Sequence, residues 1–451
     1  MYLDFLYERF AESPETEALI YRHQPTRYRE LLEYCHEAEA FLARNDVERG
    51  SIVALAADYS PRAIAMLLAL AEHRCTTLQV GHASGQKLDD MAAIGEIEIL
   101  LHEEDHGFRL ERTGRKASHA LYATLREQQH PGLVLFSSGS TGAIKGTVHD
   151  LSRLLKKFHK RRHSLRTIAF LLFDHIGGID TLFYSLSNAS TLILVDKRDP
   201  ATICEAVEKH RAQVLPAAPT FLNLLYFSKE YTRFDLSSLE YVTYGAEMMP
   251  EQTLAFCREM FPTAKLVQRY GTSEVGSPRS QSKSSDSLWV RIGGEGYEWR
   301  VVDGILQIKA ESAMLGYLNA PSPFTEDGWF VTGDCVEVDG EYIRFLGRKS
   351  DIINVGGKKV YPAEVEAVLK QMPEVVEATV QGEPNVLLGN IVTARVWLAS
   401  EGTDEAAMRT QLKQFVAKRL DSFKVPVKIS FSYDSNYATD RFKKVRSPGA
   451  V

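Results

Sequence analysis

The feature that most constrains this fold is an alternation of short apolar runs and helical patterns between Ser51 and about Gly271. Short apolar runs bounded by turn residues are typical of buried strands. We predict strands at Ile52–Ala57, Thr76–Val80, Leu133–Phe136, Ala169–Phe173, Thr191–Val195, Gln213–Ala217, Tyr241–Tyr244 and Lys265–Gln268. Helical patterns lie between them, as at Pro61–Glu72 and Ala201–Lys209. The alternation predicts an α/β fold of mostly parallel sheets covered by helices.

The pattern changes twice towards the C-terminus. Residues 286–348 predict a smaller antiparallel subdomain, with strands at Trp299–Val302, Leu306–Lys309 and Tyr342–Phe345 between Gly-rich turns. After Arg348 the pattern is α+β, with helices expected at Glu364–Met372 and Ala406–Leu420 and strands at Val376–Gln381, Ile391–Leu398 and Val427–Ser432. We therefore expect a large N-terminal domain over 1–348 and a small C-terminal domain over 349–451.

A loop rich in glycine and hydroxyl groups follows the apolar run 133–136. It comprises Ser137, Ser138, Gly139, Ser140, Thr141, Gly142, Ala143, Ile144, Lys145 and Gly146. Backbone N–H groups, hydroxyls and a lysine suit an anion, and polyphosphate is the natural ligand for such a loop. The loop is not an ordinary P-loop, because Ile144 precedes Lys145 and Gly146 follows it. A flexible surface loop is the alternative interpretation.

The composition excludes several classes of protein. The chain has 451 residues and a net charge of −6, so no global attraction to nucleic acid or anionic membrane is expected. We see no signal peptide and no apolar run long enough to span a membrane, which favours a cytoplasmic location. The five cysteines are scattered without metal-ligand spacing, which argues against a disulfide framework or a structural zinc site.

Further motifs follow the loop in a fixed order. They are Phe173 to Gly178, Tyr244 to Glu247, Tyr270 to Glu274, Thr332 to Asp334, Gly347 to Asp351 and Thr439 to Arg446. Together they resemble the signatures of the adenylate-forming superfamily, which holds acyl- and aryl-CoA ligases, peptide-synthetase adenylation domains and beetle luciferases. The resemblance spans residues 137–446 and implies a large N-terminal domain with a mobile C-terminal lid hinged after Arg348. The N-terminal part is short for the family.

The resemblance implies a site for ATP and Mg²⁺. Loop 137–146 would hold the β- and γ-phosphates, Glu274 would hold Mg²⁺, and Ser273 would touch the α-phosphate. Asp334 would accept hydrogen bonds from both ribose hydroxyls, since a carboxylate has two oxygens with several lone pairs. The other candidate nucleotide contacts are Tyr270 near the adenine, Arg348 at the ribose, and Gly245, Ala246, Glu247 and Gly271. Taken alone, Glu274 would be a solvated carboxylate and Asp334 a turn residue.

The acid would bind beside His175, which in the family stands at the carboxylate site. A structural histidine is the alternative. Candidate pocket residues are Phe173, Ile176, Tyr244, Gly245 and Ala246. Ile176 occupies the position where peptide-synthetase domains have an Asp for the α-amino group, so an α-amino acid is disfavoured and an aryl or medium-chain acyl acid is expected.

The lid would supply Lys443, which the spacing from Thr439 and to Arg446 selects over Lys444. Phe442 replaces the glycine that usually precedes this lysine, and a solvated basic tail is the alternative. Gly356 and Gly357 resemble the loop that lines the tunnel for the accepting thiol, on CoA or on the phosphopantetheine of a separate carrier protein. An amide-forming ligase and a catalytically silent nucleotide-binding relative stay open as alternatives.

Overall fold

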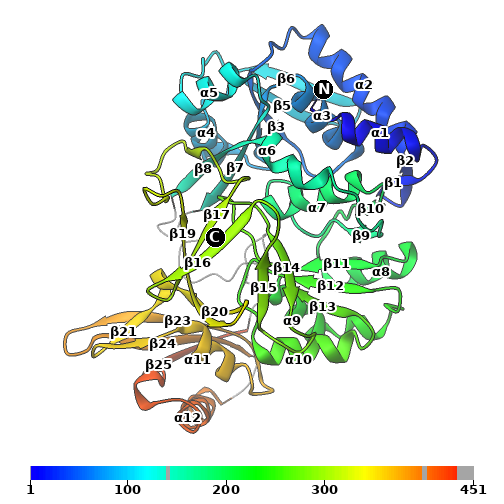
Figure 1. Cartoon of the computed structure of the whole chain (residues 1–451). Coiled ribbons are helices and arrows are strands. Elements are labelled where there is room, and N and C mark those ends of the chain that lie inside the picture. Colours follow the sequence, from blue (N-terminus) through cyan, green and yellow to red (C-terminus); the bar gives the residue numbers. More distant parts are fainter. Residues whose placement is uncertain (1, 139–142, 399–403, 434–451) are drawn as a thin grey trace.

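The computed structural model describes residues 2–138, 143–398 and 404–433 (Figure 1). Its strands form four sheets, two with seven strands, one with six and one with five. Over the described ranges, no helix combines the length and the apolar character that a bilayer crossing demands. The five cysteines are all buried free thiols.

The first large sheet has the strand order β13-β12-β11-β9-β10-β1-β2 and is parallel except at the β1–β2 hairpin. Its strands are β1 Glu17–Tyr21, β2 Gln24–Arg27, β9 Thr167–Ile168, β10 Leu192–Ile193, β11 Val214–Ala217, β12 Tyr241–Tyr244 and β13 Lys265–Gln268. Its connecting helices are α7 Ile176–Ser187, α8 Pro200–His210, α9 Pro219–Ser228 and α10 Glu251–Met260. Tyr244 pairs with Gln268, so the loops that follow β12 and β13 emerge side by side.

The second large sheet has the order β18-β8-β7-β4-β3-β5-β6. Its strands are β3 Ile52–Ala56, β4 Thr76–Gln79, β5 Ile99–Glu104, β6 Gly107–Arg112, β7 Gly132–Ser138, β8 Ile144–Asp150 and β18 Gly316–Tyr317. The four strands β3, β4, β5 and β7 are parallel, whereas β6, β8 and β18 are antiparallel to their neighbours. The helices along this part are α1 Asp4–Glu12, α2 Tyr28–Arg44, α3 Pro61–Glu72, α4 Gly85–Ile94, α5 Ala120–Gln128 and α6 Leu151–Leu155.

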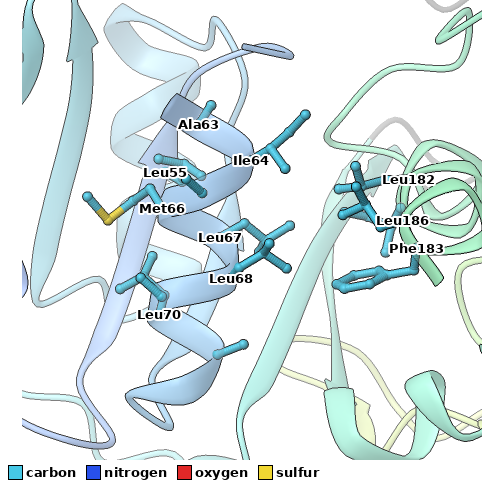
Figure 2. Close-up of a cluster of buried hydrophobic side chains, with 14 of the residues drawn as sticks. Leu55, Ala63, Ile64, Met66, Leu67, Leu68, Leu70, Leu182, Phe183 and Leu186 are labelled. Carbon is cyan, nitrogen blue, oxygen red and sulfur yellow. The ribbon is translucent and has the colours of Figure 1, made fainter. Parts of the chain in front are cut away.

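Helix α3 joins the two large sheets through one core. Ser60 caps its N-terminus by accepting the N–H of Ala63, and ten of its twelve residues are buried. A helix that is apolar all round must be covered on every side. Figure 2 shows its Ile64 and Leu67 directed towards Leu182 and Phe183 of α7. The same cluster includes residues from strands of both large sheets.

Two smaller sheets complete the chain. The six-stranded antiparallel sheet has the order β14-β15-β20-β19-β17-β16, and its strands are β14 Arg279–Ser282, β15 Val290–Gly293, β16 Tyr297–Val302, β17 Ile305–Ala310, β19 Phe330–Asp339 and β20 Tyr342–Arg348. The last sheet contains β21 Ile353–Val355, β22 Lys358–Val360, β23 Val375–Asn385, β24 Gly389–Leu398 and β25 Lys428–Ser432. Helices α11 Pro362–Leu369 and α12 Glu405–Ala417 pack on this last sheet and share its separate core.

Two expectations need correction. The strand predicted at Ala169–Phe173 is wrong, since β9 ends at Ile168 and residues 169–175 approach α7 without forming a strand. The aromatic side chains of this run are buried, and an apolar run can be a covered loop as well as a strand. The predicted loop 137–146 is also shorter than expected, because Ser137 and Ser138 extend β7 and residues 144–146 begin β8.

Candidate nucleotide and acid site

A buried carboxylate lies where β19 and β20 pair. Asp334 is 8% exposed and lies opposite Arg348 in the ladder. The Arg348 Nε is 2.9 Å from its Oδ1, and the Tyr270 hydroxyl donates to its Oδ2 at 2.8 Å. Burial raises the pKa of Asp334, against the opposing effects of Arg348 and Tyr270. The structure therefore brings together three residues that the sequence assigns to the ribose and adenine end of a nucleotide.

Tyr270 is positioned by the end of β13 and by an aromatic neighbour. Its ring stacks on Phe345 with centroids 4.8 Å apart, and its N–H donates to Ser280 Oγ at 3.2 Å. Burial, together with the nearby Asp334 charge, raises the pKa of its phenol well above the ordinary value. The phenol therefore stays protonated and donates to the carboxylate.

A second cluster lies at the other end of the same short segment. The Tyr317 hydroxyl donates to Glu274 Oε1 at 2.6 Å, and Lys145 Nζ lies 5.3 Å from the centre of the Tyr317 ring. Strand β18 carries Tyr317 and pairs it with Thr147 of β8, which places it beside the strand that holds Lys145. Lys145 and Glu274 are thus linked through Tyr317, a residue that the sequence interpretation missed. A two-residue strand outside every recognised motif gave no signal for it.

His149 forms a hydrogen bond with the residue that precedes Glu274. This fully buried residue of β8 donates from Nε2 to the Ser273 carbonyl at 2.6 Å. Burial lowers the pKa of His149, so the neutral imidazole is favoured. The sequence interpretation missed His149 too, and its neighbours Val148 and Asp150 gave no clear sign of a buried position.

The β7–β8 hairpin carries the predicted phosphate loop at its tip. Ser137 pairs with Lys145 and Ser138 with Ile144. Gly139, Ser140, Thr141 and Gly142 lie outside the described residues. The described flanks show that the loop leaves one strand and returns along its antiparallel neighbour, and that it does not open a helix.

His175 forms the N-cap of α7, where its Nδ1 accepts the N–H of Gly177 at 3.2 Å. The first turn is tight, because a Cβ at Gly178 would lie 2.0 Å from the Leu172 carbonyl oxygen. Phe173 and Ile176 are buried beside it. The turn therefore fixes His175 at the start of a helix that is itself locked into the main core.

The segment after β12 packs against the segment after β13. Tyr244 is buried, and a Cβ at Gly245 would lie 2.5 Å from the Arg269 carbonyl oxygen. Ala246 has φ of +67°, a left-handed conformation that is costly for a residue with a Cβ. The Glu247 carboxylate accepts a hydrogen bond from the Thr220 hydroxyl at 2.6 Å. Strain of this kind often marks a functional loop.

Gly356 and Gly357 do not contact these clusters, because a Cβ built at either would meet at most Leu388 within 4 Å. They form the turn between β21 and β22, at the edge of the last sheet, where the Gly356 N–H donates to the Leu388 carbonyl at 2.8 Å. Gly271 packs against the Ser277 backbone and side chain, within the segment that links the two clusters. Lys443 lies outside the described residues.

The described residues fit a magnesium nucleotide. No group of three or more His, Cys, Asp or Glu side chains converges in the described ranges. Mg²⁺ is commonly held by one or two carboxylates together with substrate phosphates, and within the described residues only Glu274 Oε1, not Oε2, has a hydrogen-bond partner. Each Asp334 oxygen has one neighbour and a second lone pair for a ribose hydroxyl.

Comparisons with known proteins also indicate a nucleotide-binding enzyme family. Residues 6–303 match the model of the AMP-binding enzyme family, and residues 364–438 match that of the AMP-binding enzyme C-terminal domain. The chain is 28% identical to an indoleacetate–CoA ligase of Aromatoleum aromaticum over 331 residues, 67% of this chain and 64% of the relative. It is also 28% identical to a long-chain-fatty-acid–CoA ligase of Bacillus subtilis over 341 residues, 68% of this chain and 59% of the relative.

The matched region thus spans about three fifths of these relatives' length. The anthranilate CoA ligase AuaEII, solved with anthranoyl-AMP, has a similar fold with a TM-score of 0.83 and 19% identity, covering 98% of this chain and 95% of the other. The family match covers more than half of the residues, in agreement with the motifs and the two clusters. The chain belongs to the AMP-binding enzyme family.

Proposed function

We propose that this protein activates a carboxylic acid with ATP, forming an acyl-adenylate and releasing pyrophosphate. The observation that carries the proposal is the segment from Tyr270 to Glu274, which joins the Asp334 cluster to the Glu274 cluster. A carboxylate suited to the ribose and a carboxylate suited to Mg²⁺ are thereby held near each other, and, after the larger effect of burial, the charge of Glu274 is close enough to raise the pKa of Asp334. Family membership supports the same assignment.

Each cluster has a task in this reaction. Asp334 would orient the ribose and so fix the α-phosphate relative to the acid, a positioning effect that contributes strongly to rate. Lys145 would offset the charge that builds on the phosphates as pyrophosphate leaves. Glu274 would hold Mg²⁺, which would supply further positive charge there when bound. His175 would face the acid's carboxylate. Lys443 would add a further positive charge from the C-terminal domain.

The second step would transfer the acyl group to a thiol, on CoA or on a carrier protein's phosphopantetheine. The relatives named above are CoA ligases, which supports a thiol acceptor over an amine. A Cβ at Gly356 would meet only Leu388 within 4 Å and one at Gly357 would meet nothing, so their proposed role at the thiol would require a rotation of the C-terminal domain.

The test is acid-dependent exchange between ATP and labelled pyrophosphate. We expect exchange with aryl or medium-chain acids, and its loss on chelation of Mg²⁺. Absence of exchange over a broad panel would contradict the proposed activity. Offering CoA, a phosphopantetheinylated carrier protein or an amine to the preformed adenylate then identifies the acceptor, and release to the amine alone would replace the thiol assignment with an amide-forming one.

A further inference from the structure

Two cationic side chains contact one carboxylate of α7, and two more lie near them. Lys157 Nζ contacts Asp180 Oδ1, and an Arg269 guanidinium nitrogen lies 3.9 Å from Asp180 Oδ2. Arg279 begins β14 beside this pair, because the next residue, Ser280, accepts the Tyr270 N–H at 3.2 Å. Arg162 is the fourth cation, and burial together with the charges of Arg279 and Arg269 lowers the pKa of its guanidinium. We call these five residues the Asp180 cluster.

The cluster carries more positive charge than its surroundings balance. Asp180 is its one carboxylate, and among the described residues neither Arg162 nor Arg279 forms an ion pair. The neighbouring Arg161 differs, because it is paired with Glu12 of α1. Three uncompensated cations close together repel one another, and proteins tolerate such arrangements mainly where an anion binds.

The cluster borders the place assigned to the acid. Asp180 lies five residues after His175, which corresponds to about 7 Å along a helix. Arg269 lies directly between β13 and Tyr270, with its backbone against Gly245. Lys157 also donates to the Ser277 carbonyl at 2.9 Å, in the loop that follows Glu274. The cationic group therefore lies next to three segments assigned to the site, namely the start of α7, Gly245 and the loop after Glu274.

We propose that the natural acid carries a second carboxylate, which binds at the Asp180 cluster through the guanidinium groups of Arg269 and Arg279. A guanidinium suits this task because its planar fork matches a carboxylate in two parallel hydrogen bonds. Lys157 neutralises the charge of Asp180. Asp180 therefore orients the Arg269 guanidinium and leaves the positive charge of Arg269 available to the ligand. The inference rests on the proposed adenylation and adds the class of acid.

The test compares matched acids in the pyrophosphate exchange assay, which needs no acceptor. Hexanoate is paired with adipate, octanoate with suberate, and benzoate with isophthalate and terephthalate. We expect at least one diacid to exceed its monoacid partner in kcat/KM by tenfold or more. In Arg269→Gln and Arg279→Gln the KM for that diacid should rise about tenfold more than the KM for its monoacid partner. Arg161→Gln, whose side chain is paired elsewhere, is the control and should behave as the unmodified protein.

The outcomes separate the two proposals. Exchange with monoacids at equal or higher efficiency than with diacids would overturn the second-carboxylate inference and leave adenylation standing. Exchange with neither class would overturn the adenylation proposal and the inference together. Variants that change only the KM for CoA or a carrier protein would assign the cluster to the acceptor and also overturn the inference. Arg269→Lys, which keeps the charge and loses the fork, should lie between the unmodified protein and Arg269→Gln.

Discussion

At the scale of single residues, Asp334 shows how a buried charge is kept ready for a ligand. Its two oxygens face different partners, a guanidinium and a phenol. Both partners stabilise the ionised carboxylate against the effect of burial on its pKa. The ionised form is the one that accepts hydrogen bonds from two neighbouring hydroxyls.

Asp334→Ala should therefore weaken nucleotide binding. Each lost hydrogen bond to a charged group costs about 1.5–3 kcal/mol, so we expect at least a tenfold rise in the Kd for a non-hydrolysable ATP analogue. Calorimetry gives the value. Asp339→Ala is the control, because Asp339 lies on the same strand and is paired with Lys283 at the surface. An unchanged affinity in a folded Asp334 variant would refute the assignment.

His149 should make the fold sensitive to acid. Burial lowers its pKa from the ordinary value of 6.5, so the folded state favours neutral imidazole and the unfolded state takes up a proton at higher pH. Its contribution to stability is present above about pH 6.5 and is lost as the pH falls towards the depressed pKa. Between pH 7 and pH 5, the His149→Gln variant should lose less unfolding free energy than the unmodified protein.

Urea denaturation at several pH values measures this slope. His36→Gln, a change at an exposed position of α2, is the control and should keep the original slope. Equal slopes in all three proteins would mean that other groups account for the acid sensitivity.

Site residues were predictable where they lie in motifs and not where they act from outside them. Tyr270, Asp334 and Arg348 belong to recognised segments, and the structure groups them. Tyr317 reaches Glu274 only because β18 pairs with β8, some 170 residues earlier in the chain. Lys157 and Arg269 likewise meet Asp180 from other parts of the chain, Lys157 from 23 residues away. Contacts of this kind depend on tertiary structure, which a local pattern does not specify.

At the scale of elements, α7 links the core to the site. His175 and Gly177 form its first turn, Asp180 lies on its second, and Leu182, Phe183 and Leu186 bury its other end against α3 (Figure 2). The packing of those side chains therefore determines where the site residues stand.

Leu186→Ala should destabilise the N-terminal domain by about 2–5 kcal/mol, the usual cost of a cavity at a fully buried leucine. Chemical denaturation monitored by tryptophan fluorescence measures it. Leu387→Ala removes the same atoms from a leucine that is 91% exposed, and should cost almost nothing. Similar losses in both variants would show that α7 is not anchored as described.

Element boundaries were predicted best where strands alternate with helices. Tyr241–Tyr244, Lys265–Gln268 and Pro61–Glu72 have the predicted bounds. The failures occurred at segment 169–173, where burial without pairing looks like a strand, and at 137–146, where strand pairing extends into polar residues. Both depend on neighbours that the local sequence does not reveal.

At the scale of the whole molecule, the C-terminal domain contacts the N-terminal domain. One contact is made by the buried Glu377 of β23, which accepts from Lys370 within its own domain and lies 3.5 Å from Asn223 Nδ2 of α9. Its core is separate from those of the large sheets. A domain with its own core is suited to rotate as a unit.

Lys443→Ala should abolish most adenylation, while Lys444→Ala should have a mild effect. The expectation follows from the spacing of Lys443 in the C-terminal motif, since a lysine between carboxylate and α-phosphate would offset developing charge. Pyrophosphate exchange measures the first step, and conversion of chemically supplied acyl-adenylate measures the second, which should survive. The reverse ranking of the two lysines would place the motif one residue further on.

The shared helix α3 also has a consequence for the order in which the chain can be completed during synthesis. Its apolar side chains leave the ribosome about a hundred residues before α7, which covers part of them. Neither large sheet has a closed interior until the other half arrives. The nascent chain therefore carries an apolar helix with one face uncovered while about a hundred further residues are added, a condition that invites chaperone binding and makes a shortened chain ending before α7 prone to aggregate.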